Sequence, residues 1–77
     1  MAKIAFPMIA EFEGYSEDIE DSMQYVFESL NEKDRRHYAA VEAKKLGAVG
    51  VKYIAKLFGI SAKTVESGLR ELEKKVF

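Results

Sequence analysis

Four polar side chains near the end of the chain recur at helical spacing. At about 100° per residue around a helix axis they share one face: Lys63, Ser67, Arg70 and Lys74. The opposite face is an apolar stripe of Val65, Leu69, Leu72 and Val76. A helix that buries this stripe presents positive charge and hydrogen-bond donors on its other side, with no carboxylate among them. This chemistry suits a polyanionic partner.

The residues before this helix have the spacing of a helix-turn-helix, in which a short turn joins two helices. Ala55 is small at the position where the second helix crosses the first. Gly59 can adopt the positive φ of the turn. Val65 fills the angle between the helices. The spacing therefore predicts one helix over residues 51–58 and a second over residues 62–75.

Ser61 stands where the second of these helices should begin. Its hydroxyl can accept a hydrogen bond from the backbone amide of Lys63 or Thr64, as N-cap residues do. Ser61 and Lys56 would lie near the phosphates if the pair of helices met DNA. A compact helical hairpin that never meets nucleic acid could use the same glycine turn and the same cap. The spacing alone leaves both interpretations open.

Two longer helices are predicted before this pair. Ser16 is an N-cap for a helix with one apolar stripe, formed by Ile19, Met23, Phe27 and Leu30. Asn31 with Asp34 resembles a capping box that opens the next helix. That helix runs to Leu46 and stops at Gly47.

The chain as a whole is predicted to be one all-α domain over residues 1–77. A short helix over residues 7–13 is also expected, because Pro7 suits a first helical position and Gly14 a C-terminal stop. The expected fold is a small bundle of four or five helices that contains a helix-turn-helix at residues 51–75. With 77 residues and no Cys, the chain is near the smallest size at which an apolar core suffices without disulfides.

Charge divides the chain into two halves, although the net charge is only −1. Residues 1–30 contain seven acidic residues and one Lys, whereas residues 31–77 contain eleven basic and six acidic residues. A basic half that faces a polyanion is one interpretation. Attraction between the two halves is the other. The carboxylates that follow Ser16 are interpreted as helix-dipole partners rather than as a metal or acid–base cluster.

Arg35 and Arg36 form a second basic patch, in the first turns of the helix predicted after Asn31. They could contact DNA as a secondary site. They could equally pair with the acidic helix that precedes them. The sequence leaves these two roles open.

No residue pattern predicts catalysis, a metal or a cofactor. His37 is the single His and there is no Cys, so a metal site is not expected. Residues 47–50 are predicted to form a tight linker, and their G-x-x-G spacing lacks the flanking strand of phosphate- or RNA-binding loops. Neither a signal peptide nor a membrane-length apolar stretch is found. We therefore expect a cytoplasmic protein that is not an enzyme and binds no small-molecule ligand and no membrane.

Several short matches in order give the chain a resemblance to a known family. They are Leu30 to Arg36, Ala39-Ala40, Glu42 to Lys44, Leu46-Gly47, Gly59 to Ser61, Thr64-Val65 and Gly68 to Leu72. Over residues 30–73 the chain thereby resembles the N-terminal region of bacterial insertion-sequence transposases with a DDE-type catalytic domain. The resemblance implies that this region recognises the element's DNA, and that catalysis lies in a later ribonuclease-H-like domain. Similar proteins tend to carry Arg at the positions of Ala62, Glu66 and Ser67, so the second helix here is less basic.

We expect a DNA-binding domain, the N-terminal recognition part of a transposase-like protein, that reads double-stranded DNA with the helix at residues 62–75. The expected contacts are Lys56, Ser61, Lys63, Thr64, Ser67, Arg70 and Lys74, with Arg35 and Arg36 as a secondary contact. One alternative is a helical protein-interaction module that docks a protein through the acidic first helix or forms a homodimer. A small transcription regulator is the other.

Overall fold

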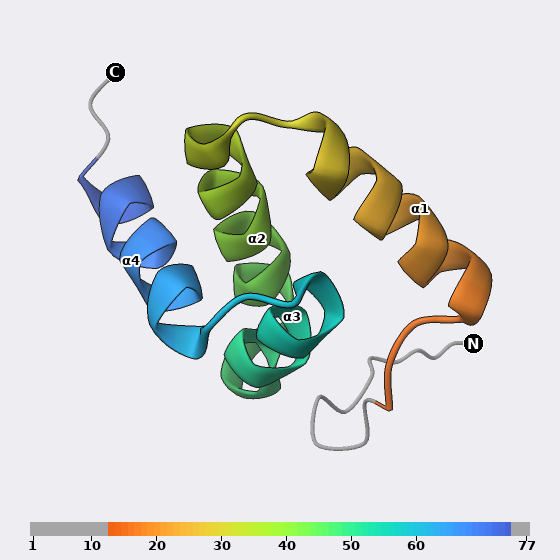
Figure 1. Cartoon of the computed structure of the whole chain (residues 1–77). Coiled ribbons are helices and arrows are strands. Elements are labelled where there is room, and N and C mark those ends of the chain that lie inside the picture. Colours follow the sequence, from red (N-terminus) through yellow and green to blue (C-terminus); the bar gives the residue numbers. More distant parts are fainter. Residues whose placement is uncertain (1–12, 75–77) are drawn as a thin grey trace, which may run out of the picture.

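The computed structural model describes residues 13–74, which are helical and contain no strand (Figure 1). The elements in chain order are α1 (Glu17–Ser29), α2 (Glu32–Leu46), the 3₁₀ turn η2 (Gly47–Val49), α3 (Gly50–Phe58) and α4 (Ala62–Glu73). The expected all-α class is confirmed. Four or five helices were expected. This part of the chain has three long helices, α1, α2 and α4, and the nine-residue α3. Of the helix expected at residues 7–13, only Glu13 is described, and it is not helical.

The three predicted N-caps are all present. Ser16 accepts a hydrogen bond from the amide of Ile19 at 3.3 Å, and Asn31 accepts one from Asp34 at 2.8 Å. Ser61 accepts from the amide of Thr64 at 3.0 Å. Each cap satisfies an amide that has no partner inside its own helix.

The ends of the last two helices differ slightly from the prediction. Residues 47–50 were expected to be a linker, but Gly50 already belongs to α3 and residues 47–49 form the 3₁₀ turn. Gly50 has ordinary helical angles, φ −66° and ψ −43°, so nothing stops the helix from including it. α4 ends at Glu73 rather than near residue 75.

The core forms where α3 and α4 pack on α2. Ala39 of α2, Ile54 of α3 and Val65 of α4 are fully buried. Two glycines set the distance between the backbones. An added Cβ at Gly50 would lie 2.0 Å from the carbonyl oxygen of Ala43, and one at Gly68 would lie 2.5 Å from that of Arg36. Because interiors are close-packed, neither position has room for a side chain.

α1 is attached to the rest of the protein mainly by side chains. Met23 and Phe27 are its buried residues. The Phe27 ring stacks on Phe58 of α3, with centroids 4.3 Å apart. The Gln24 amide donates to the carbonyl oxygen of Leu57 at 3.0 Å. α1 therefore rests on the C-terminal end of α3 as well as on α2.

A tyrosine of α3 secures the start of α1. The Tyr53 hydroxyl accepts a hydrogen bond from the backbone amide of Tyr15 at 3.0 Å and donates one to the carboxylate of Glu20. Burial and the hydrogen bond to Glu20 raise the pKa of Tyr53 above 10.0. The phenol therefore stays protonated and keeps this hydrogen bond at neutral pH.

The two outer helices lie on opposite sides of the molecule. Figure 1 shows α1 on one side of α2 and α4 on the other, with α3 below them in this view. None of the described helices has the length and apolar character needed to cross a membrane.

Candidate nucleic-acid interface

A three-residue turn that begins at Gly59 joins α3 to α4. Gly59 has φ +69°, the left-handed conformation predicted from the sequence. The amide of Ile60 donates to the carbonyl oxygen of Ala55 at 3.0 Å, and the amide of Gly59 to that of Lys56 at 3.3 Å. These bonds satisfy carbonyls at the end of α3, as in a Schellman motif. Ser61 then caps α4 directly, so the direction of α4 is defined within three residues.

Buried side chains hold α3 and α4 at a fixed angle. Ala55 is 7% exposed and Val65 is fully buried, as their expected roles at the crossing require. Leu69 packs against the same core from the next turn of α4. Gly68 is buried against α2 and leaves no space between the two backbones. This side of α4 packs on the protein, with Val65 and Gly68 buried, whereas Leu69 and Leu72 of the predicted buried stripe are half-buried.

The opposite side of α4, together with its C-cap residue Lys74, carries the basic ridge, which we define as Lys63, Arg70 and Lys74. All three side chains are exposed. None of them forms an ion pair with a carboxylate of residues 13–74. The Arg70 guanidinium donates to the half-buried Ser67 hydroxyl at 3.1 Å, which brings these two predicted contacts together. The ridge thus offers three solvated cations along one face.

The other predicted contacts lie around the start of α4. The hydroxyls of Ser61 and Thr64 are 3.0 Å apart, and Ser61 also caps the helix, so both already have partners within the turn. Lys56 is exposed on α3. Its side chain borders a hollow that Gln24 and Leu57 also line, between α1 and α3. Lys56 therefore stands on α3, away from the ridge of α4.

Arg35 pairs with α1, which is one of its two predicted roles. Its Nε donates to the carbonyl oxygen of Phe27 at 3.0 Å, and its Nη2 to that of Glu28 at 2.8 Å. The guanidinium carbon lies 5.3 Å from the centroid of the Phe27 ring. Arg35 thus closes the C-terminal end of α1, where a cation is favoured by the helix dipole. Two of its guanidinium nitrogens, Nε and Nη2, are engaged in this contact.

Arg36 pairs with α4 rather than with α1. Its Nε lies 3.0 Å from Oε1 of Glu71, and Nε2 of His37 lies 2.8 Å from the same oxygen. The hydrogen bond from Arg36, which has the larger effect, and the hydrogen bond with His37 lower the pKa of Glu71 below 4.5. Sequence periodicity gave no signal for this cluster, because 35 residues separate Arg36 from Glu71.

The cluster changes the balance of charge on α4. Glu71 is compensated by its partners on α2, so it does not oppose the ridge. Glu66 and Glu73 are exposed and have no ion pair with any described residue. These two carboxylates of α4 therefore lie to one side of the ridge and not among its cations.

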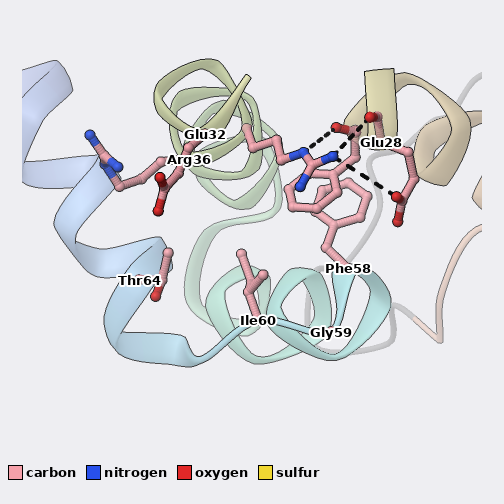
Figure 2. Close-up of a pocket in the computed structure, with 9 residues that line it drawn as sticks. Glu28, Glu32, Arg36, Phe58, Gly59, Ile60 and Thr64 are labelled. Atoms are coloured by element: carbon pink, nitrogen blue, oxygen red, sulfur yellow. Dashed lines mark hydrogen bonds and ion pairs between the residues drawn. The ribbon is translucent and has the colours of Figure 1, made fainter. Parts of the chain in front are cut away.

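A hollow of about 380 Å³ lies between the start of α2 and the turn from α3 to α4 (Figure 2). Its charged lining is mixed, with Arg35 and Arg36 facing the same space as Glu28 and Glu32. Phe58, Ile60 and Thr64 complete the other side. Because two cations are matched by two carboxylates, the hollow has no net charge with which to hold an anion.

Few ion pairs join the acidic and basic halves of the described chain, although α1 packs on α2 and α3. Within residues 13–74, one ion pair joins them, between Glu28 and Arg35 at 4.0 Å. Attraction between the halves, one interpretation of the charge pattern, is therefore not achieved by a network of salt bridges. The same residues contain no group of His, Asp and Glu placed to hold a metal ion.

Comparison with protein-family models, with curated proteins and with solved structures finds no match for this chain. Its function must therefore be argued from the geometry of its own residues.

Proposed function

We propose that this chain binds double-stranded DNA through α4, with α3 and α4 acting as a helix-turn-helix. The observation that carries the proposal is the basic ridge of Lys63, Arg70 and Lys74, exposed and without ion pairs in the described chain. The opposite face of the same helix is fixed by Val65 and Gly68. A rigid helix with one cationic face is suited to bind in a groove of DNA, which is bordered by phosphates.

The dimensions and charges of α4 support binding in the major groove. An α-helix with its side chains fits a groove about 12 Å wide. Lys63, near the start of α4, and Arg70, two turns later, can reach phosphates along the groove. Ser67 lies between them and already bonds to Arg70. Lys56 on α3 provides a further cation for the backbone, since the helix before the turn crosses the phosphates in this mode of binding.

Phosphate contacts should dominate the affinity. Ala62, Glu66 and Ser67 stand where the resemblance to transposases leads one to expect Arg. Few donors therefore remain to read the edges of bases, and Glu66 repels phosphates at close range. Arg35 and Arg36, the expected secondary contact, are committed to Phe27, Glu28 and Glu71. We infer salt-sensitive binding with modest sequence preference.

The wider role that we propose is DNA recognition in the cytoplasm by the N-terminal part of a transposase-like protein. The resemblance over residues 30–73 supports it. A small transcription regulator would use the same surface. The gene distinguishes the two: a reading frame that continues past Phe77 into spaced Asp, Asp and Glu residues supports the transposase, and a stop codon supports the regulator.

Removal of two cations from the ridge tests DNA binding directly. Each lost phosphate contact lowers the slope of log K against log salt by about 0.9, so Lys63→Ala with Arg70→Ala should flatten it by about 1.8. Binding should weaken while thermal stability stays unchanged, because neither side chain belongs to the core. Fluorescence anisotropy with a labelled duplex, repeated from low to moderate salt, measures both the affinity and the slope.

The matched control removes two exposed cations from α2, as Lys33→Ala with Lys44→Ala. This control should keep most of the affinity and the slope. If the wild-type chain fails to bind at low salt, or if the two double variants behave alike, α4 is not the DNA-binding element.

A further inference from the structure

α1 carries an apolar strip that the rest of the described protein leaves uncovered. Four large hydrophobic side chains are exposed within residues 13–74, and three of them belong to this helix: Ile19 at 45%, Tyr25 at 77% and Val26 at 40%. Ile19 and Val26 are two turns apart and lie beside the buried stripe of Met23 and Phe27. Single exposed hydrophobic residues are ordinary, but three on one short helix indicate a binding surface.

The charge of α1 shows what kind of partner this surface fits. The helix contains five carboxylates and no basic residue. Glu20 bonds to Tyr53, and Glu28 lies near Arg35. Asp18 and Asp21 are exposed, and neither forms an ion pair with any residue of the described range. The helix dipole favours the acids of the first turn, which are Glu17, Asp18 and Glu20. Asp21, which was also expected to be a dipole partner, lies beyond that turn, and so does Glu28.

We propose that the outer face of α1 binds a cationic amphipathic helix of a partner protein. We define this face as Asp18, Ile19, Asp21, Ser22, Tyr25 and Val26. Apolar side chains of the partner cover Ile19 and Val26, while the small Ser22 allows close approach of the two helices. Lys or Arg of the partner pairs with Asp18 and Asp21 and packs on the ring of Tyr25. DNA is repelled by the same carboxylates, and so is a second copy of α1.

This inference does not depend on DNA binding. The outer face of α1 and the basic ridge of α4 belong to helices on opposite sides of the molecule (Figure 1). Either surface can therefore be altered without touching the other, and the two proposals can fail separately.

The test uses the full chain and a labelled helical peptide of Leu and Lys, about as long as α1. A second peptide has the same composition in a scrambled order that removes its amphipathic period. Anisotropy should show binding of the amphipathic peptide and much weaker binding of the scrambled one. Ile19→Ser with Val26→Ser should weaken binding by about tenfold or more, as lost apolar contact does. Val41→Ser is the matched control, since Val41 is exposed to 41% on α2.

A second pair of variants tests the charges. Asp18→Asn with Asp21→Asn should reduce the affinity for the Leu–Lys peptide, and most at low salt. Glu66→Gln with Glu73→Gln removes the same charge from α4 and should have little effect. Circular dichroism confirms that every variant keeps its helices.

Several results would overturn the proposal. They are no binding at low salt, equal binding of the scrambled peptide, and equal losses from Val41→Ser and from the α1 variants. Sedimentation equilibrium adds another: self-association that Ile19→Ser with Val26→Ser abolishes would mean that a second copy covers this face.

Discussion

α4 and α1 both pack on the central helices, but by different means. α4 brings its backbone against α2 through Gly68, where an added Cβ would lie 3.0 Å from that of Ala40. α1 has no glycine and reaches α2 and α3 through Met23 and Phe27. The connections differ as well. Gly59 turns the chain into α4 with a positive φ, whereas Leu30 and Asn31 join α1 to α2 in extended conformations.

This difference divides the surface of the molecule into two kinds. A helix held by close backbone contact has little freedom to move, so the groups on its other side are fixed in position. The basic ridge of α4 is such a set, and fixed cations suit a rigid polyanion. A helix held by a few large side chains leaves apolar neighbours uncovered, as Ile19 and Val26 on α1 show. Such a surface suits another protein.

The contact of α4 with α2 should be the most sensitive to a single change. Gly68→Val places a branched side chain against the backbone of Arg36, and we expect it to lower the free energy of unfolding by about 3 kcal/mol. Urea denaturation measures this loss. Ala62→Val, on the exposed first turn of α4, is the control and should change stability little. Equal effects of the two substitutions would show that close approach at Gly68 does not hold α4.

The turn before α4 should come next. Gly59→Val forces a β-branched residue into the left-handed region and should cost ~1–3 kcal/mol. No atom lies within 4 Å of an added Cβ at Gly59, so the loss reports backbone strain and not a clash. Thermal melts of the two proteins measure it. An unchanged midpoint would mean that α4 does not need this turn conformation.

The smallest effect is expected from acid, and it should act on α4 more than on α1. Arg36 and His37 lower the pKa of Glu71 below 4.5, so their contribution to stability is complete above pH 4.5 and is lost as pH falls through the lowered pKa. Glu71→Gln should therefore destabilise the protein at pH 7, and this difference should shrink in acid. Urea midpoints at several pH values measure it.

Glu28→Gln is the matched variant on α1. Arg35 holds that helix mainly through backbone carbonyls, which do not titrate. Loss of the Glu28 charge should therefore lower the free energy of unfolding at pH 7 by less than loss of the Glu71 charge. A larger loss from Glu28→Gln than from Glu71→Gln would reverse the proposed order of the two attachments.

Local features of the fold were predictable because they depend on neighbouring residues. The caps at Ser16, Asn31 and Ser61 and the positive φ at Gly59 follow from side chains within one helical turn. The burial of Val65 follows from helical periodicity. In the candidate interface, the exposed ridge of α4 could be placed on one face for the same reason.

Contacts between distant segments were not predictable in this way. From the sequence, Arg35 and Arg36 could contact DNA or pair with the acidic first helix. In the structure Arg35 closes α1, whereas Arg36 binds Glu71 of α4, a partner that neither interpretation included. The close approach of Gly50 to Ala43 was also missed, since the glycines at residues 47–50 were interpreted as a linker.

The order of residues was enough to predict that this protein is helical, where most of its helices begin and end, and that its charge is divided between two halves. Hydrogen-bonding groups, apolar spacing and glycine act over a few residues, so these properties are written in short segments. Which charges of residues 13–74 lack an ion-pair partner depends instead on how the helices pack. Arg35, Arg36 and Glu71 find partners across helices, whereas Lys63 and Arg70 on α4 and Asp18 and Asp21 on α1 have no ion pair within residues 13–74. Whether a charge is neutralised depends on what lies beside it in space, and packing alone brings those groups together.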